Sequence, residues 1–185
     1  MKKVMLTALA ALFGGAVLAP MAATASDGQI TFSGNVNAST CTIASSANGT
    51  TGTANFAVAL PTVSKASLGA AAGVTAGTTP FSLSLTNCPA GTNTVAANFD
   101  ASAAINTNGR LNNTNSGAGA ATGVDLQVLN NSQAAINLNT QANATTAAVT
   151  GGNATLNYFV QYYNNGGTLG AGTVASAVNY SITYK

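Results

Sequence analysis

Charged side chains are scarce in this chain of 185 residues, and histidine is absent. There are five Lys and Arg and three Asp and Glu, so charged residues make up 4% of the sequence, against about 25% in ordinary soluble domains. Coiled coils and nucleic-acid-binding proteins need dense charge, so neither class fits and no nucleic-acid partner is expected. Without histidine, a Ser-His-Asp triad cannot form and most metal sites are hard to build. We therefore expect no enzyme activity and no cofactor.

What the chain does contain is typical of β-structure. Hydrophobic residues make up 46% of it, Gly occurs 20 times, and Thr, Val and Asn are abundant. These residues favour strands and turns over helices. A glycosidase-like pair of Asp100 and Asp125 is an acid–base alternative, but we interpret both as solvated carboxylates at strand ends. The Tyr-rich stretch 158–163 could stack on sugars, although its alternation favours packing in a core.

The first 25 residues have the features of a signal peptide. Lys2 and Lys3 precede an apolar stretch at 4–19, and small residues at Ala23 and Ala25 predict cleavage after Ala25. The alternative is a membrane anchor, but the apolar run is shorter than the roughly 20 residues that a span needs. We expect residues 26–185 to be exported and to form one domain.

Export also bears on the two cysteines, Cys41 and Cys88. An even pair in an exported chain is expected to form a disulfide. Such a crosslink would stabilise the fold by about 4 kcal/mol on the chain-entropy model. No Cys-x-x-Cys redox spacing is present, so we interpret the pair as structural.

Several stretches alternate apolar and polar residues with a period of two, which indicates half-buried strands of antiparallel sheets. They are 29–38, 53–63, 81–88, 124–129, 156–163 and 178–185. Asn108-Gly109 and Asn165-Gly166 are turn signals between them, and the stretches 66–77 and 112–123 are expected to be loops. No convincing helix is found. The pattern predicts an all-β protein with the architecture of a β-sandwich.

The first and last predicted strands have unusual features. Gly34 lies in the middle of the apolar face of 29–38, and a glycine within a strand often marks the close approach of another backbone. The last strand ends at Lys185, so its outer edge is expected to be exposed. Exposed apolar strand edges invite pairing with another chain.

Taken together, these residues resemble the pilins of chaperone–usher fimbriae, close to type 1 fimbrial major subunits. The stretch from Ile30 to Val36 ahead of Cys41 resembles the donor strand of the family. The stretch 81–88 is similar to its second-cysteine strand, and 124–129 is similar to another of its strands. The end of the chain, with Gly172, alternating apolar residues and the penultimate Tyr184, is similar to the signature of the family.

The resemblance implies an incomplete immunoglobulin-like β-sandwich that lacks its last strand and is completed by donor-strand exchange. Residues 26–38 would be the donor-strand extension and 39–185 the pilin domain. The implied donor-strand residues are Ile30, Phe32, Gly34, Val36 and Ala38. The implied groove edge, bound first by a chaperone, consists of Gly172, Val178, Tyr180, Ile182, Tyr184 and Lys185.

The implied partners are identical or related pilins joined head to tail, a periplasmic chaperone and an outer-membrane usher. The implied location is a fimbrium on the bacterial surface, reached through the periplasm, where the subunit supports adhesion to a receptor that the residues do not identify. Two alternatives stay open. One is a minor tip, adaptor or sugar-binding adhesive pilin, and the other is a standalone secreted carbohydrate-binding β-sandwich.

Overall fold

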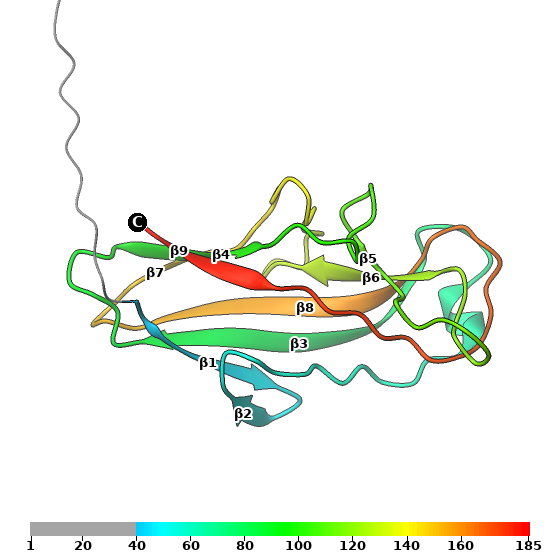
Figure 1. Cartoon of the computed structure of the whole chain (residues 1–185), viewed down its shortest axis with the longest axis horizontal. Helices are drawn as coiled ribbons and strands as arrows, with labels where there is room; N and C mark the ends of the chain where they lie inside the picture. The colour runs from blue at the N-terminus through cyan, green and yellow to red at the C-terminus, as the bar shows by residue number, and fades with distance from the viewer. Residues whose placement is uncertain (1–39) are drawn as a thin grey trace, which may run out of the picture. The chain divides into compact units, whose positions relative to one another are not determined.

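The computed structural model describes residues 40–185, and the expected signal peptide and donor-strand extension lie outside them. The regular elements of the described part are strands, joined by long connecting segments and one short 3-10 turn (Figure 1). Its strands are β1 (Thr42–Ala47), β2 (Thr50–Gly52), β3 (Thr75–Thr86), β4 (Thr94–Phe99), β5 (Leu111–Asn112), β6 (Val124–Leu129), β7 (Thr146–Ala148), β8 (Ala154–Asn164) and β9 (Tyr180–Tyr184), with one 3-10 turn, η1 (Lys65–Leu68). No helix in this part of the chain is long and apolar enough to span a membrane.

The larger sheet has the strand order β2-β1-β3-β8-β6-β5, with every pair antiparallel. Its centre is the pairing of β3 with β8, in which Leu83 lies opposite Leu156. Both side chains are buried, whereas the neighbouring Ser82 and Asn157 are more exposed. The alternation in the sequence therefore directs one face of the sheet into the core.

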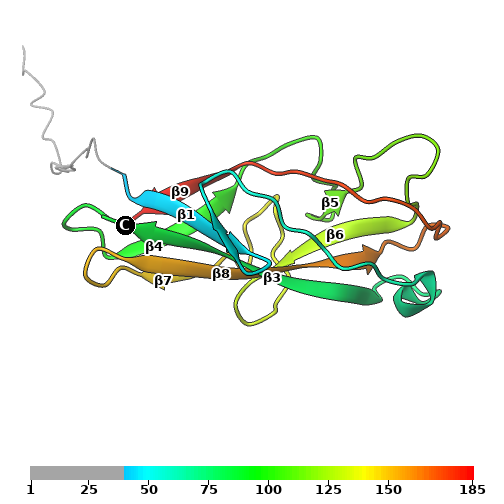
Figure 2. The same cartoon turned by 90° about the horizontal axis from the view of Figure 1, so that it is seen from below.

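The smaller sheet, of order β7-β4-β9, packs over that face (Figure 2). From β4 it contributes Val95, Ala97 and Phe99, all of which are buried. The Phe99 ring meets the Tyr158 ring of β8 edge-on, with centroids 5.7 Å apart. The two antiparallel sheets thus enclose one core, which confirms the prediction of an all-β, immunoglobulin-like sandwich.

Most of the predicted strands are present, but two expectations were wrong. The stretches 81–88, 124–129 and 156–163 lie within or overlap β3, β6 and β8, whereas 53–63 belongs to no strand. That stretch is extended, but no strand in the described structure pairs with it. The stretch 66–77 is not simply a loop, since η1 ends at Leu68 and β3 begins at Thr75.

Two substantial strands were missed. The alternation of β4 is visible in its sequence, TVAANF, but the run is short and rich in alanine. The sequence of β1, TIASSA, has a single large apolar residue, so its strand character depends on its pairing with β3. The last strand is β9, which begins only at Tyr180. Residues 178 and 179 precede it outside the strand, although the carbonyl oxygen of Asn179 still accepts a hydrogen bond from the N–H of Asp100 at 2.8 Å.

The disulfide is present. Cys41, just before β1, is bonded to Cys88, just after β3. Because Thr42 pairs with Thr86 in the same ladder, the crosslink joins two strands that are already neighbours. It fixes the end of the sheet at which residues 40–41 enter the sandwich.

Candidate functional site: an open groove between the sheets

A groove with a volume of about 830 Å³ opens between the two sheets on one side of the sandwich. Its floor consists of core side chains from both sheets. They are Ile43, Phe81, Leu83, Phe99, Leu111, Leu126, Val128 and Val160. The groove therefore leaves part of the apolar core uncovered between the sheets.

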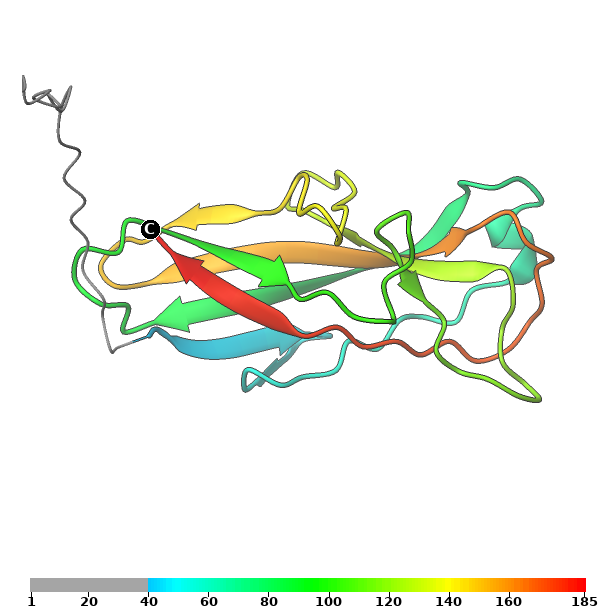
Figure 3. The same ribbon diagram turned by 45° about the horizontal axis from the view of Figure 1, so that its top comes forward.

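One wall of the groove is the extended segment 54–60, which follows β2 (Figure 3). Its even-numbered residues, from Ala54 to Leu60, are half-buried, whereas the odd-numbered ones are exposed. The ring of Phe56 lies 6.0 Å from that of Phe81 in β3. The segment therefore has the side-chain alternation of a strand without the hydrogen bonds of one.

The side-chain amide of Asn48 holds this wall from the outside. The backbone N–H of Ala59 donates to Asn48 Oδ1, and Asn48 Nδ2 donates to the carbonyl oxygen of Ala59, both at 2.8 Å. Asn48 lies in the turn between β1 and β2 with φ of +52°, a conformation that asparagine tolerates better than most residues. The two bonds reproduce the exchange that a residue of a neighbouring strand would make.

The other wall is the segment 174–180, which leads into β9. Val174, Ser176, Val178 and Tyr180 are half-buried and alternate with exposed residues. Ser176 Oγ is buried and has no hydrogen-bond partner among the described residues. This wall thus mirrors the first: it is extended, it alternates, and it stays outside the ladders as far as β9.

The loop 112–123 holds the second wall from the outside, chiefly through Asn113. The N–H of Ala175 donates to Asn113 Oδ1 at 3.0 Å, and the N–H of Thr114 donates to the carbonyl oxygen of Ala175 at 2.7 Å. Asn113 Nδ2 donates to the carbonyl oxygens of Thr173 at 3.0 Å and Ala121 at 2.9 Å. An asparagine therefore holds each wall of the groove.

The bonds on Ala59 and Ala175 determine which backbone groups remain for the groove. In extended chain the N–H and C=O of one residue point to one edge, and those of the next residue point to the other. With Ala59 bonded outward, the backbone of Val58 and Leu60 faces the opposite edge. By the same argument Val174 and Ser176 face away from Asn113. None of these four residues forms a hydrogen bond within residues 40–185.

One end of the groove is closed by a contact between the walls. Tyr180 Oη donates to the carbonyl oxygen of Ala54 at 2.9 Å, and burial raises the pKa of Tyr180 above its usual value. Ala54 begins the first wall and Tyr180 ends the second. Because these two residues lie close together and both segments line one groove, the two walls run in opposite chain directions. A strand placed between them would be antiparallel to one and parallel to the other.

The structure gives the predicted edge residues different positions. Val178 and Tyr180 line the groove. Ile182 and Tyr184 of β9 are half-buried against the core beyond it, and the carbonyl oxygen of Lys185 accepts hydrogen bonds from the N–H groups of residues 93 and 94. All of them were expected on a single edge. Two of them line the groove and three lie further along the strand.

Gly172 lies outside the groove, against the loop 112–123. A Cβ atom at this position would overlap the carbonyl oxygen of Gly119 and the carbonyl carbon of Ala120. Glycine is needed there because two backbone segments approach closely. The predicted donor-strand residues, from Ile30 to Ala38, lie outside the described residues.

Neither bracing asparagine, Asn48 or Asn113, was predicted from the sequence. The dipeptide Asn48-Gly49 is a turn signal that could have located the β1–β2 hairpin. The side-chain bonds of Asn48 to Ala59, eleven residues away, cannot be predicted from the residues around Asn48. Asn113 lies in a loop rich in Asn and Gly, and nothing in the sequence distinguishes it from the asparagines around it.

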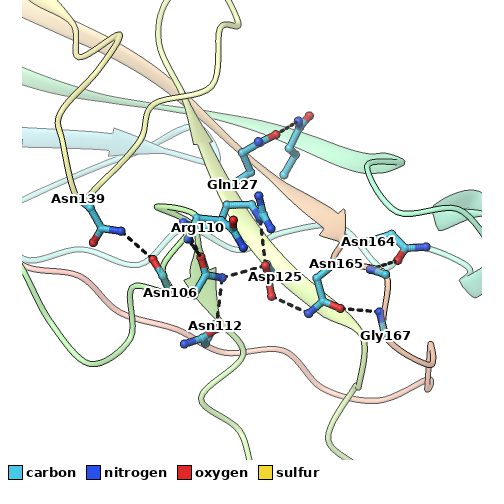
Figure 4. Close-up of polar contacts among 12 residues, drawn as sticks. Asn106, Arg110, Asn112, Asp125, Gln127, Asn139, Asn164, Asn165 and Gly167 are labelled. Atoms are coloured by element: carbon cyan, nitrogen blue, oxygen red, sulfur yellow. Dashed lines mark hydrogen bonds and ion pairs between the residues drawn. The ribbon is translucent and has the colours of Figure 1, made fainter.

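The interpretation of Asp125 as a solvated carboxylate was wrong. It is 3% exposed and forms an ion pair with Arg110, Nε to Oδ2, at 2.9 Å. Asn106 donates to the same oxygen at 2.9 Å and Asn165 to Oδ1 at 2.8 Å (Figure 4). The Arg110 guanidinium also lies 4.0 Å from the centroid of the Tyr163 ring, so the pair ties two loops to the sheet.

The alternative chemical sites find no support in the geometry. Asp100 is exposed and accepts a hydrogen bond from Ser181 Oγ, whereas Asp125 is already satisfied by its three donors. Tyr158 of the aromatic stretch is 1% exposed in the core, and burial raises its pKa to about 12. Within residues 40–185, no three His, Cys, Asp or Glu side chains gather as metal ligands.

Comparisons with known proteins identify the family of the chain. The family model described as Type-1 fimbrial protein, A, matches residues 60–185. The chain is 44% identical over 175 residues to the Major fimbrial subunit SMF-1 of Stenotrophomonas maltophilia (strain K279a), covering 90% of this chain and 98% of that protein. It is 42% identical over 168 residues to the F17 fimbrial protein of Escherichia coli, covering 86% and 88%. It is 35% identical over 182 residues to the Minor fimbrial subunit HifD of Haemophilus influenzae, covering 92% and 80%.

Proposed function

Since this chain belongs to the type-1 fimbrial protein family and is a fimbrial subunit of the chaperone–usher type, we propose that it forms the rod of a fimbrium by donor-strand complementation. Members of this family are structural pilins that assemble into polymers, not enzymes. In the proposed mechanism each subunit leaves one strand position empty and receives that strand from a neighbour.

The observation that carries the proposal is the groove itself. Its apolar floor is open, and both of its walls are extended and alternate. Neither wall forms a backbone ladder in the described structure between residues 54–60 and 174–178. Unpaired backbone on both sides of an apolar cleft favours the insertion of an extended strand, because the strand satisfies backbone groups and covers apolar area together.

We assign the donor role to residues 26–38 of the next subunit. Their alternation directs Ile30, Phe32 and Val36 to one face, and burying these three side chains would contribute about 5–9 kcal/mol. Contacts of this head-to-tail kind do not close on themselves, so a filament grows. The cell-surface fimbrium of the family is the expected site of the polymer.

The remaining parts of the proposal follow the chaperone–usher route. Residues 1–25 would be removed as a signal peptide, which leaves the extension 26–38 and the sandwich domain 39–185. In the periplasm a chaperone would lend a strand along the wall that leads into β9, and an outer-membrane usher would exchange it for the extension of the next subunit. Val178 and Tyr180 are the edge residues that such a strand would meet inside the groove.

A role as the major rod subunit is favoured over a minor one by the relatives. Identity is higher to a protein named as a major fimbrial subunit, and the match spans 98% of that protein. The match to a named minor subunit is weaker and spans 80% of it. A minor adaptor pilin would use the same groove, so the abundance of the chain in purified fibres distinguishes the two roles.

The donor assignment is tested by Gly34→Arg with Asn35→Arg as the matched control. The predicted alternation places Gly34 on the face that enters the groove and Asn35 on the opposite face. Gly34→Arg should abolish fibres seen by electron microscopy while a chaperone pull-down still recovers the subunit. Asn35→Arg should leave fibres in place.

One result would contradict the proposal, and another would show that the variant does not fold. Long fibres built from the Gly34→Arg subunit alone would remove the donor role of the extension. Loss of both the fibres and the chaperone complex would instead show that the substitution prevents folding. Deletion of residues 26–36 would then separate the two explanations, because it removes the donor without adding a charge.

A further inference from the structure

We propose that Asn48 and Asn113 are positioning residues that hold the two walls of the empty groove in register for an incoming strand. This inference rests on the proposed function of the groove. It adds to that function a device, built from two side-chain amides, that prepares the subunit to accept a strand before the strand arrives.

The need for such a device follows from the architecture. Residues 54–60 and 174–178 are extended but lie outside the ladders, so neither segment is held by a full row of backbone bonds. Fixing the backbone of each residue costs conformational entropy. If the walls were free to move, an incoming strand would have to supply this ordering from its own binding energy.

An asparagine side chain is suited to replace a missing strand at a single point. Its amide offers one carbonyl acceptor and one N–H₂ donor, which match the N–H and C=O of a backbone residue. Asn48 uses both on Ala59 at 2.8 Å. Asn113 accepts from Ala175 at 3.0 Å and donates to the carbonyl oxygen of Thr173 at 3.0 Å.

The residue that each asparagine bonds determines which backbone edge of the wall faces the groove. Both Ala59 and Ala175 are exposed, and their backbone groups are used on the outer side. This leaves the backbone of Val58 and Leu60 on one wall, and of Val174 and Ser176 on the other, directed to the groove. A rotation of either segment by one residue would instead turn its apolar side chains outward.

The neighbouring contacts support a positioning role over general stabilisation. Asn48 bonds only to the segment that forms the wall, and it comes from a hairpin whose β2 residues are all exposed. Asn113 joins the loop 112–123 to the second wall, and Thr114 adds the bond to the carbonyl oxygen of Ala175. The same amide also orders its own loop, because it donates to the carbonyl oxygen of Ala121 and accepts from the N–H of Asn115. Neither asparagine contributes a side chain to the groove lining.

The test measures strand binding in the full chain carrying Gly34→Arg, which is expected to accept a strand but not to donate one. The probe is a fluorescent peptide with the sequence of residues 26–38. Asn48→Gly removes the first amide and, because glycine also adopts positive φ, adds no backbone strain. Asn113→Ala removes the second amide. Asn153→Ala is the control, since it deletes a side-chain bond to the backbone of Gly151 at a position that does not line the groove.

We expect Asn48→Gly and Asn113→Ala each to weaken peptide binding about tenfold, since each deletes the side-chain hydrogen bonds that order its wall before the strand binds. The loss should appear mainly as slower association, because the walls must be ordered during the encounter. Asn48→Asp and Asn113→Asp keep the acceptor and should lose less. Asn153→Ala should bind as the Gly34→Arg background does.

Thermal unfolding separates positioning from stability. Peptide affinity unchanged in Asn48→Gly and Asn113→Ala, with any effect confined to the melting temperature, would overturn the inference and leave the proposed function intact. Failure of the Gly34→Arg background itself to bind the peptide would overturn both. If Asn113→Ala does not fold, the Asp variants and Asn48→Gly still decide the outcome.

Discussion

The hydroxyl of Tyr180 donates a hydrogen bond to the carbonyl oxygen of Ala54 at 2.9 Å, and it thereby joins the first residue of β9 to the wall that follows β2. The two residues are 126 positions apart in the chain. Because they come from opposite walls, this single bond closes one end of the groove. The groove is open between the walls and bridged at Tyr180.

Tyr180→Phe should lower the free energy of unfolding by about 0.5–1.5 kcal/mol, since it deletes this one hydrogen bond and keeps the ring. Urea titration followed by circular dichroism measures the change. Tyr184→Phe is the matched control, because the Tyr184 hydroxyl has no hydrogen-bond partner among the described residues. Equal effects of the two substitutions would show that the contact across the groove contributes nothing of its own.

Cys41→Ser should leave little folded subunit in the periplasm. The disulfide to Cys88 restricts the unfolded chain, and its loss should cost about 4 kcal/mol, which is a large part of the stability of a domain of this size. Quantitative immunoblotting of periplasmic extracts measures the yield. The double variant with Cys88→Ser should behave like the single one, and normal fibres from either would contradict a stabilising role for the crosslink.

Arg110→Met should destabilise the fold by about 3–5 kcal/mol, because it leaves the buried carboxylate of Asp125 without its counter-charge. The side chains of the pair are 15% and 5% exposed. Adding Asp125→Asn should recover much of the loss, since the uncompensated charge is then gone. Asp100→Asn, at an exposed carboxylate, serves as the control and should have little effect in the same urea titrations.

Stability should fall at alkaline pH because of Tyr158. Burial raises its pKa to about 12 in the folded chain, whereas an unfolded tyrosine ionises near pH 10. The unfolded state therefore loses its proton first, so the contribution of this group is present in full below pH 10 and is lost as the pH rises to about 12. The difference amounts to about 3 kcal/mol.

Urea unfolding at a series of pH values between 9 and 12 tests this expectation. Burial raises the pKa values of Tyr162 and Tyr180 as well, so a shallower slope should remain in Tyr158→Phe. A slope in Tyr158→Phe identical to that of the unmodified chain would show that another group governs the alkaline transition.

The sequence by itself determined the strands whose apolar pattern is strong. In β3, β6 and β8 large apolar residues such as Leu83, Leu126 and Leu156 recur at every second position, and that period indicates strands packed over a core. The cysteine pair and the similarity of the end of the chain to fimbrial pilins were also present in the sequence. The weaker alternation of β4, with two alanines among its central residues, was passed over.

The tertiary structure decided what depends on partners distant in sequence. Residues 53–63 alternate as a strand does, but a strand also needs a neighbour, and the fold leaves this one beside an open groove. The burial of Asp125 required Arg110, Asn106 and Asn165 to converge on it. The bracing of Ala59 by Asn48 likewise arises only once a hairpin folds back on the wall. Periodicity specifies which face of a segment is apolar, whereas hydrogen-bond partners and the desolvation of a charge are set by the packing of the whole chain.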